Sequence, residues 1–172
     1  MNSSPQVGLR WAIKRSFLEY IGRAPGGRGT LSDDAVVTEA TEVVFTPDLG
    51  NPPPPAQEGT VLAFRGAVTF SAHFGMLLVR IANPWVTIQG THGELTVLDP
   101  FQREGDARLR LATFEIDGHA IADGFERWTA ADVRLAPEGC TLFNDVYPAA
   151  EPLEPLTIIV PAAALRIDNT GK

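Results

Sequence analysis

Cysteine is nearly absent from this chain, since Cys140 is the only one among 172 residues. A single cysteine cannot form an internal disulfide, so the fold does not depend on oxidation and suits a reducing compartment. Tyrosine is almost as scarce, and occurs only at Tyr20 and Tyr147. No stretch approaches the ~18 consecutive apolar residues of a membrane-spanning helix. We therefore expect no membrane insertion.

Basic charge and targeting signals are also sparse. Lysine and arginine number 14 against 21 aspartate and glutamate residues, which gives a formal net charge of −7. Nucleic acids and anionic membranes need a clustered basic surface, and no segment supplies one. The first eight residues lack the basic start and apolar core of a signal peptide. We expect a cytoplasmic protein that does not bind nucleic acid.

The common enzyme motifs are missing. The sequence has no Walker loop, no G-x-G-x-x-G after a strand, no G-x-S-x-G elbow and no paired-cysteine metal site. His73, His92 and His119 lie far apart on different predicted strands or turns, and their spacing does not support a three-histidine zinc site.

The periodicity of apolar residues predicts one helix followed by strands. Residues 9–21 repeat apolar side chains at three- and four-residue spacing, with Gly22 available to end the helix and the loop after it flexible. From residue 35 onward the period is close to two, and the separations are too short for a second helix. The predicted strands are 36–45, 61–70, 76–82, 85–89, 94–98, 107–116, 128–135 and 156–160.

These elements predict a mainly β fold: an antiparallel β-sandwich or partly open barrel with one N-terminal α-helix. The length fits a single domain over residues 1–172. Residues 50–59 are rich in proline, and we expect a surface loop inside this domain, because too little chain precedes it to fold alone.

Four sequence motifs occur in order along the chain. They are Leu-x-Trp-x-x-Lys-x-Ser-Phe-x-x-Tyr-Ile-Gly at 9–22, Phe-Ser-x-His-x-Gly at 70–75, Asn-Pro-x-Val-x-Ile-x-Gly-x-x-Gly at 83–93, and Phe-x-x-x-Tyr-x-Ala at 143–149, followed by Leu-Glu-Pro at 153–155. Together they resemble the HtaA-type haem-uptake domain over about residues 8–160. The resemblance implies a β-rich haem-binding domain of the kind found on proteins that scavenge haem.

The resemblance also implies roles for individual residues. Tyr20 matches the family's iron ligand, His73 the histidine that supports it, and Tyr147 the aromatic residue that lies against the porphyrin. On this basis we expect the helix to carry the ligand site and the cofactor to be haem b, that is, Fe(III) protoporphyrin IX. The expected cofactor-binding residues are Ser16, Phe17, Tyr20, Arg23, His73 and Tyr147, with Tyr20 as the metal ligand.

Elementary chemistry agrees with these roles. A free phenol has a pKa near 10, so its ionisation at pH 7 costs about 4 kcal/mol. Ferric iron and an imidazole N–H donor can supply that energy, which is why Tyr20 needs a partner such as His73. Ser16, one helical turn before Tyr20, is then placed to meet one haem propionate. Arg23 and Arg28 can balance the negative charge of the second propionate.

The sequence departs from the family pattern at several positions. Ala72 precedes the histidine where glycine is usual, Met76 begins a stretch that lacks a common acidic residue, and Val146 replaces one of two aromatic residues. Structural alternatives also stay open. Tyr20 can simply close a helix, His73 can be a satisfied edge histidine, and Tyr147 can pack a corner between sheets.

Three functions are compatible with the sequence. The leading one is a non-catalytic haem carrier that exchanges ferric haem with a donor or acceptor protein. The alternative is a tyrosinate-ligated haem enzyme with biosynthetic or peroxide-dependent chemistry, which needs a proton-handling group such as His92 or His119 at the open side of the iron. The third is a module for another flat ligand or a structural partner. A homodimer is left open.

Overall fold

The computed structural model describes residues 7–38, 41–49, 59–102 and 107–162. Most of these residues form antiparallel strands, which confirms the predicted mainly β fold. The helical elements are α1 (Arg15–Arg23) and two short 3₁₀ segments, η1 (His73–Gly75) and η2 (Pro137–Phe143). The strands are β1 (Gly8–Trp11), β2 (Arg28–Ser32), β3 (Val36–Val37), β4 (Val43–Pro47), β5 (Thr60–Arg65), β6 (Ala67–Ala72), β7 (Leu77–Ala82), β8 (Trp85–Gln89), β9 (His92–Leu98), β10 (Arg108–Glu115), β11 (Gly118–Ala122), β12 (Phe125–Ala130), β13 (Asp132–Leu135), β14 (Pro152–Leu153) and β15 (Leu156–Pro161).

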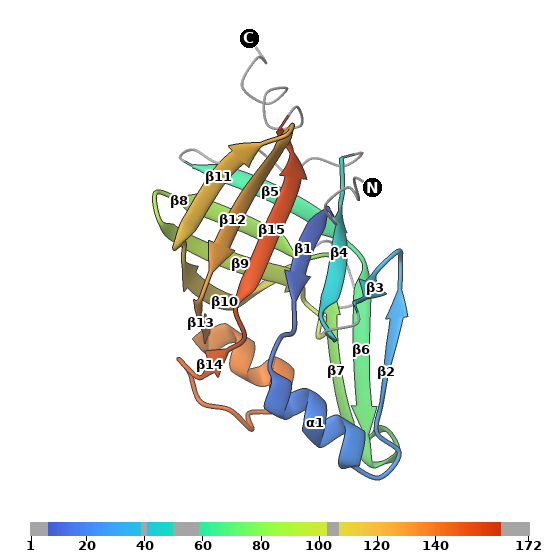
Figure 1. Ribbon diagram of the computed structural model, residues 1–172. Helices are drawn as coiled ribbons and strands as arrows, with labels where there is room; N and C mark the ends of the chain where they lie inside the picture. Colours follow the sequence, from blue (N-terminus) through green and yellow to red (C-terminus); the bar gives the residue numbers. More distant parts are fainter. Residues whose placement is uncertain (1–6, 39–40, 50–58, 103–106, 163–172) are drawn as a thin grey trace.

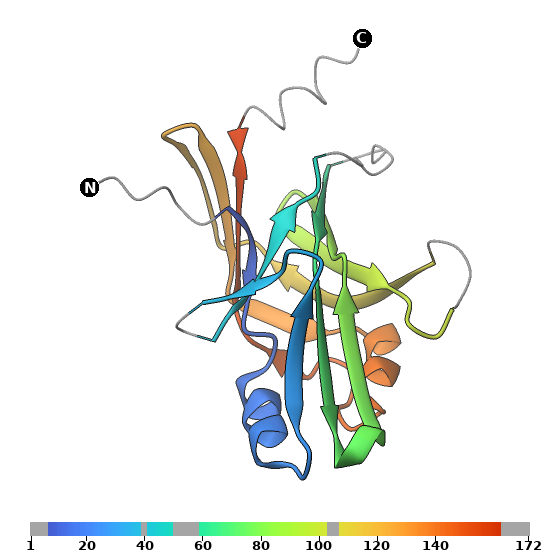
Figure 2. The same cartoon turned by 90° about the vertical axis from the view of Figure 1, so that its right-hand side faces the viewer.

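The strands form one large sheet and one small sheet. The large sheet has the order β11-β12-β15-β1-β4-β5-β8-β9-β10-β13-β14, with β3 paired to β4, and the small sheet has the order β2-β6-β7. The large sheet curls without its edge strands β11 and β14 pairing, as in a partly open barrel (Figure 1). The small sheet extends from its lower end, beside α1 (Figure 2).

A long hairpin runs through both sheets, which the short β2–β3 connection also joins. Its two arms run from β5 into β6 and from β7 into β8, and they bend at Gly66 and Asn83. Gly66 has φ 128°, and its N–H donates to Asn83 Oδ1 at 3.1 Å while Asn83 N–H donates to the Gly66 carbonyl at 2.8 Å. The predicted strand 61–70 is therefore two strands, because only glycine adopts that backbone angle without strain.

The predicted helix over residues 9–21 is wrong in its first half. Leu9 and Trp11 lie in β1, which pairs with β15 on one side and β4 on the other, and the helix begins only at Arg15. Both side chains are fully buried in the core, and Trp11 Nε1 donates to the carbonyl of Glu154 at 2.8 Å. Ile13, between the strand and the helix, has φ 66°, so the backbone there is in the left-handed region and continues neither element. Apolar spacing alone did not separate the two elements, since Leu9 and Trp11 also fit a strand period.

Besides β1, three strands were not predicted: β2, β11 and the two-residue β14. All five residues of β2 are exposed, and four of the five in β11 are exposed too, so neither segment alternates apolar and polar residues. The predicted flexible loop after the helix therefore shortens, because β2 begins at Arg28. The proline-rich loop predicted at 50–59 lies almost wholly outside the described residues. Among the described helices, none has the length and apolar character needed to cross a membrane.

The β9–β10 contact offers a test of core packing. A Cβ added at Gly93 would lie 2.1 Å from Phe114 Cε2, whereas one added at Gly22 in α1 would meet nothing within 4 Å. We expect Gly93→Ala to destabilise the protein by about 1–3 kcal/mol through overpacking. Gly22→Ala should instead stabilise it by up to about 1 kcal/mol, because alanine favours helix. Urea denaturation of both variants measures the difference, and equal stabilities would contradict the packing at Gly93.

Candidate functional site

A cleft of about 640 Å³ opens between α1, the β6–β7 turn and the segment at the end of η2. Three parts of the chain that lie far apart in sequence therefore meet at the lower end of the molecule (Figure 1). Its volume is in the range of ligand pockets. The lining residues are mostly apolar or aromatic: Ser16, Phe17, Tyr20, His73, Met76, Leu77, Phe143, Asn144, Val146 and Tyr147.

Helix α1 presents one wall of the cleft. Phe17 and Ile21 are its buried residues and anchor it to the core. Ser16 and Tyr20 are one turn apart, as predicted, and both line the cleft. The last turn is closed by a hydrogen bond from Ala24 N–H to the Tyr20 carbonyl at 2.9 Å. The backbone at Tyr20 is therefore held by the buried side chains of Phe17 and Ile21 and by the hydrogen bond from Ala24.

Tyr20 and His73 meet at the mouth of the cleft. The phenolic Oη of Tyr20 lies 2.5 Å from Nε2 of His73, although 53 residues separate them in sequence. The Tyr20 side chain is 46% exposed, so the pair is open to solvent. In such a pair the imidazole nitrogen accepts the hydrogen bond of a neutral phenol, and when protonated it donates to a phenolate. The pair thus joins the phenol of α1 to the imidazole of η1 through one short hydrogen bond.

Three aromatic rings form the floor of the cleft. Phe17 packs edge-to-face on Phe143 at 5.2 Å and on Tyr147 at 6.5 Å between ring centroids, and Phe143 and Tyr147 are 5.7 Å apart. Lys14 Nζ lies 5.1 Å from the Tyr147 ring and 3.3 Å from a carboxylate oxygen of Glu151. The floor is therefore apolar and aromatic, and Lys14 also contacts the ring of Tyr147.

Burial raises the pKa of Tyr147 above the usual value, and the carboxylate of Glu151 and the phenol of Tyr20 raise it further. A raised pKa favours the neutral phenol, so Tyr147 stays protonated at neutral pH. Of the two tyrosines in the cleft, Tyr147 is suited to packing rather than to supplying an anionic oxygen.

The HtaA family model matches residues 6–159 of the chain. This chain belongs to the HtaA family. No curated protein matches the sequence.

Solved structures of HtaA proteins share the fold. The chain is 23% identical to the C-terminal domain of HtaA from Corynebacterium glutamicum, with a TM-score of 0.68 over 88% of this chain and 94% of that one. It is 18% identical to the N-terminal domain of the same protein, with a TM-score of 0.69 over 90% and 99%. The heme binding protein HtaB from the same organism is 20% identical, with a TM-score of 0.63 over 89% and 91%.

Five of the six residues predicted for the site of this HtaA-family chain line the cleft. They are Ser16, Phe17, Tyr20, His73 and Tyr147. Arg23, the sixth, lies in a smaller adjacent hollow of about 350 Å³, which shares Ser16, Tyr20 and His73 with the main cleft. Its guanidinium is 3.8 Å from the carboxylate of Glu19, one helical turn earlier.

The sequence missed part of the lining. Met76, Leu77, Phe143, Asn144 and Val146 also line the cleft. Met76 and Val146 were noted only as departures from the family pattern, yet their side chains are 86% and 66% exposed. The available signal was their proximity in sequence to predicted site residues, because Val146 directly precedes Tyr147 and Met76 lies three residues after His73.

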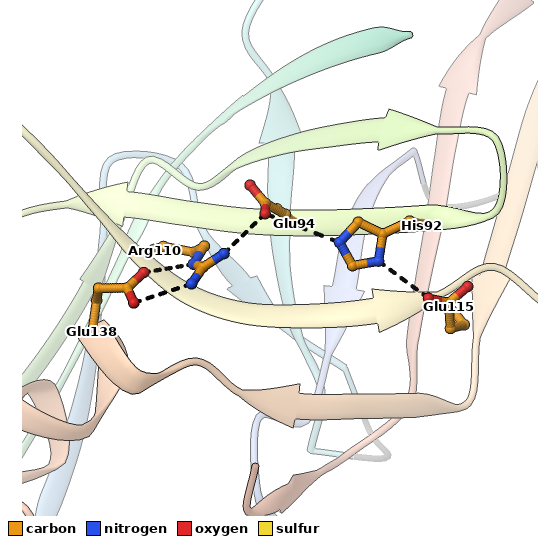
Figure 3. Close-up of polar contacts among 5 residues, drawn as sticks. All are labelled: His92, Glu94, Arg110, Glu115 and Glu138. Carbon is orange, nitrogen blue, oxygen red and sulfur yellow. Dashed lines mark hydrogen bonds and ion pairs between the residues drawn. The ribbon is translucent and has the colours of Figure 1, made fainter. Parts of the chain in front are cut away.

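The other two histidines lie elsewhere. Figure 3 shows His92 on β9 beside Glu115, within a polar cluster that joins Glu94, Arg110 and Glu138 on the surface of the large sheet. Hydrogen bonds to Glu138 and Glu94 raise the pKa of Arg110, and the bond to Arg110 lowers that of Glu138. His119 Nε2 is 2.6 Å from Glu126 Oε1, and its ring stacks on Trp128.

Neither histidine lines the cleft. Within the described ranges, no group of three or more histidine, cysteine, aspartate or glutamate side chains is arranged to hold a metal ion. His73, His92 and His119 lie on three separate elements, η1, β9 and β11.

Proposed function

We propose that this chain binds ferric haem b in the cleft, with the phenolate of Tyr20 as iron ligand, and acts as a haem carrier. The observation that carries the proposal is the Tyr20 Oη to His73 Nε2 contact of 2.5 Å at the mouth of an aromatic cleft. Membership of the HtaA family supports it, as does the fold shared with a protein named as a heme binding protein.

The residues present fit this group. Met76 and Val146 are unusually exposed for apolar side chains, and both face a cleft of ligand size. A flat, largely apolar ligand would cover them and lie against the ring of Tyr147. Bound ferric haem supplies a Lewis-acidic iron whose preferred donors include phenolate oxygen.

The two residues at the mouth have complementary tasks. Tyr20 loses its phenolic proton on binding, and the cost of forming the anion falls when a donor faces the oxygen. His73 is that donor when Nε2 carries a proton, and it also fixes the direction of the phenol. Ser16 and Arg23, in the adjacent hollow, are the polar groups placed to meet the propionates.

A carrier explains the cleft better than an enzyme does. The titratable side chains that line the cleft in the described structure are Tyr20, His73 and Tyr147. Tyr20 and His73 are assigned to the iron side, and the pKa of Tyr147 is raised, which makes it a poor proton donor near neutral pH. An open, solvent-facing mouth suits exchange of haem with a donor or acceptor protein.

Titration of the purified protein with hemin tests the proposal directly. We expect a shifted Soret band that saturates at one haem per chain, with the visible spectrum of a phenolate-ligated ferric haem. An unchanged hemin spectrum in the presence of excess protein would contradict haem binding.

Replacing His73 tests the supporting role. We expect His73→Ala to weaken ferric haem binding by about 10–100-fold, the usual effect of losing a hydrogen-bond partner of a metal ligand. His92→Ala and His119→Ala are matched controls, because both histidines lie outside the cleft. Hemin titration of the three variants gives the dissociation constants. Equal losses in all three would show that His73 has no special role.

A further inference from the structure

The Tyr20–His73 pair depends on two backbone turns that dock on each other. Tyr20 lies in the last turn of α1 and His73 begins η1, and the contact between their side chains is exposed. An exposed hydrogen bond keeps its short distance only if the backbones that carry its two side chains are held in fixed positions relative to each other. The loop after α1 and the β6–β7 turn contact each other at the lower end of Figure 1, and this contact holds the two backbones together.

The first turn follows α1 directly. Pro25 and Gly26 occupy its centre, Gly26 has φ 66°, and Gly27 N–H donates to the Ala24 carbonyl at 2.9 Å. Proline second and a positive-φ glycine third are the residues that a type II turn requires. A Cβ at Gly27 would lie 1.8 Å from the carbonyl oxygen of Ile21, so the turn folds tightly onto the last turn of the helix.

The second turn carries His73. His73 and Phe74 have φ of 53° and 56°, followed by Gly75 at 93°, so three successive residues are in the left-handed region. Two non-glycine residues in this region cost energy, and such conformations persist only where surrounding contacts hold them. Met76 N–H closes the turn on the His73 carbonyl at 3.2 Å.

Two contacts join the turns. His73 N–H donates to the Pro25 carbonyl at 2.7 Å. The Phe74 ring lies against Gly26, where an added Cβ would be 3.3 Å from Phe74 Cδ1. Phe74 is 87% exposed and is not among the residues that line the cleft, so core packing does not explain the position of this ring.

We propose that Phe74 is a positioning residue, whose ring clamps Gly26 and so holds His73 at hydrogen-bonding distance from Tyr20. The Pro25 carbonyl fixes the His73 backbone, and the Phe74 ring prevents the turn from rotating away from α1. Phe74 thereby acts on the ligand through His73 without touching it. The inference rests on the proposed haem site for its effect on affinity, but the clamp itself is a property of the ligand-free chain.

The ligand-free chain gives the first test. In Phe74→Ala we expect the nitrogen chemical shifts of the His73 ring, measured by NMR, to move towards those of a solvated imidazole, because its bond to Tyr20 is no longer held. Phe74→Tyr keeps the ring and should restore the wild-type shifts. Ile121→Ala, also at an exposed apolar residue but on β11, is the control for surface truncation. Unchanged His73 shifts in Phe74→Ala would overturn the proposal whether or not the chain binds haem.

A double-mutant cycle gives the second test. We expect Phe74→Ala to weaken hemin binding by about three- to tenfold in the wild-type background, less than His73→Ala does. In the His73→Ala background it should have no further effect, because Phe74 acts only through that residue. A full Phe74 effect without His73 would show direct contact with the ligand and overturn the positioning role.

Discussion

Tyr20→Phe is expected to lower the affinity for ferric haem by at least about a hundredfold. Loss of a residue that only hydrogen-bonds to a metal ligand lowers the affinity by about 10–100-fold, and Tyr20→Phe removes the proposed ligand oxygen itself. The phenolate-to-iron charge-transfer absorption should disappear as well. Because the Tyr20 side chain is 46% exposed, the free energy of unfolding should change by no more than about 0.5 kcal/mol. Hemin titration and urea denaturation measure the two effects separately.

Tyr147→Phe is the matched control, because it removes the other phenolic oxygen of the same cleft and keeps the ring. The pKa of Tyr147 is raised by burial and by Glu151, so it stays neutral and should not compete for iron. We expect haem affinity within about threefold of wild type, since no metal bond is lost. If Tyr147→Phe abolished the charge-transfer absorption and Tyr20→Phe kept it, the ligand assignment would be reversed.

Phe17→Ala should have the largest effect on stability among the site residues. Phe17 is 3% exposed and packs edge-to-face on Phe70, Phe143 and Tyr147, so it belongs to the core as much as to the cleft. Truncation of a buried phenylalanine costs about 3–5 kcal/mol. We expect a loss of that size in urea denaturation, together with weaker haem binding.

Phe101→Ala is the control, because that side chain is 61% exposed. Its effect should stay within about 0.5 kcal/mol. Comparable losses in the two variants would contradict the placement of Phe17 under the cleft.

The class of the fold could be predicted from the sequence because strand periodicity is local. Leu77 and Val79 are buried and Leu78 and Arg80 exposed, the alternation that a strand with one buried face must show. Strands without such a face, β2 and β11, gave no signal. The helix boundary failed for a different reason. Leu9 fits the three- and four-residue spacing of the helix, but Leu9 and Trp11 also fit a period of two, and only their pairing with β15 and β4 decides between the two elements.

The site could be predicted only as far as the motifs reached. Tyr20, His73 and Tyr147 were identified as one set, and the structure brings them to one cleft. The position of Arg23 outside that cleft follows from the tertiary fold, which no local pattern encodes. The role proposed for Phe74 depends on its ring meeting Gly26, a contact across 48 residues that sequence spacing could not show.

The pairing of β1 has a consequence for the order in which the molecule assembles. Gly8 is opposite Ile159 and Trp11 is opposite Leu156, so the first strand is completed by the last one. Chains that pair strands far apart in sequence tend to fold slowly, because the entropy cost of closing the long loop comes before the strand contacts contribute any stabilising free energy. During synthesis, β1 can pair early with β4 but must wait for β15 to emerge from the ribosome. The helix with Tyr20 follows β1 directly, so we expect the cleft to take its final form only after β15 has been synthesised.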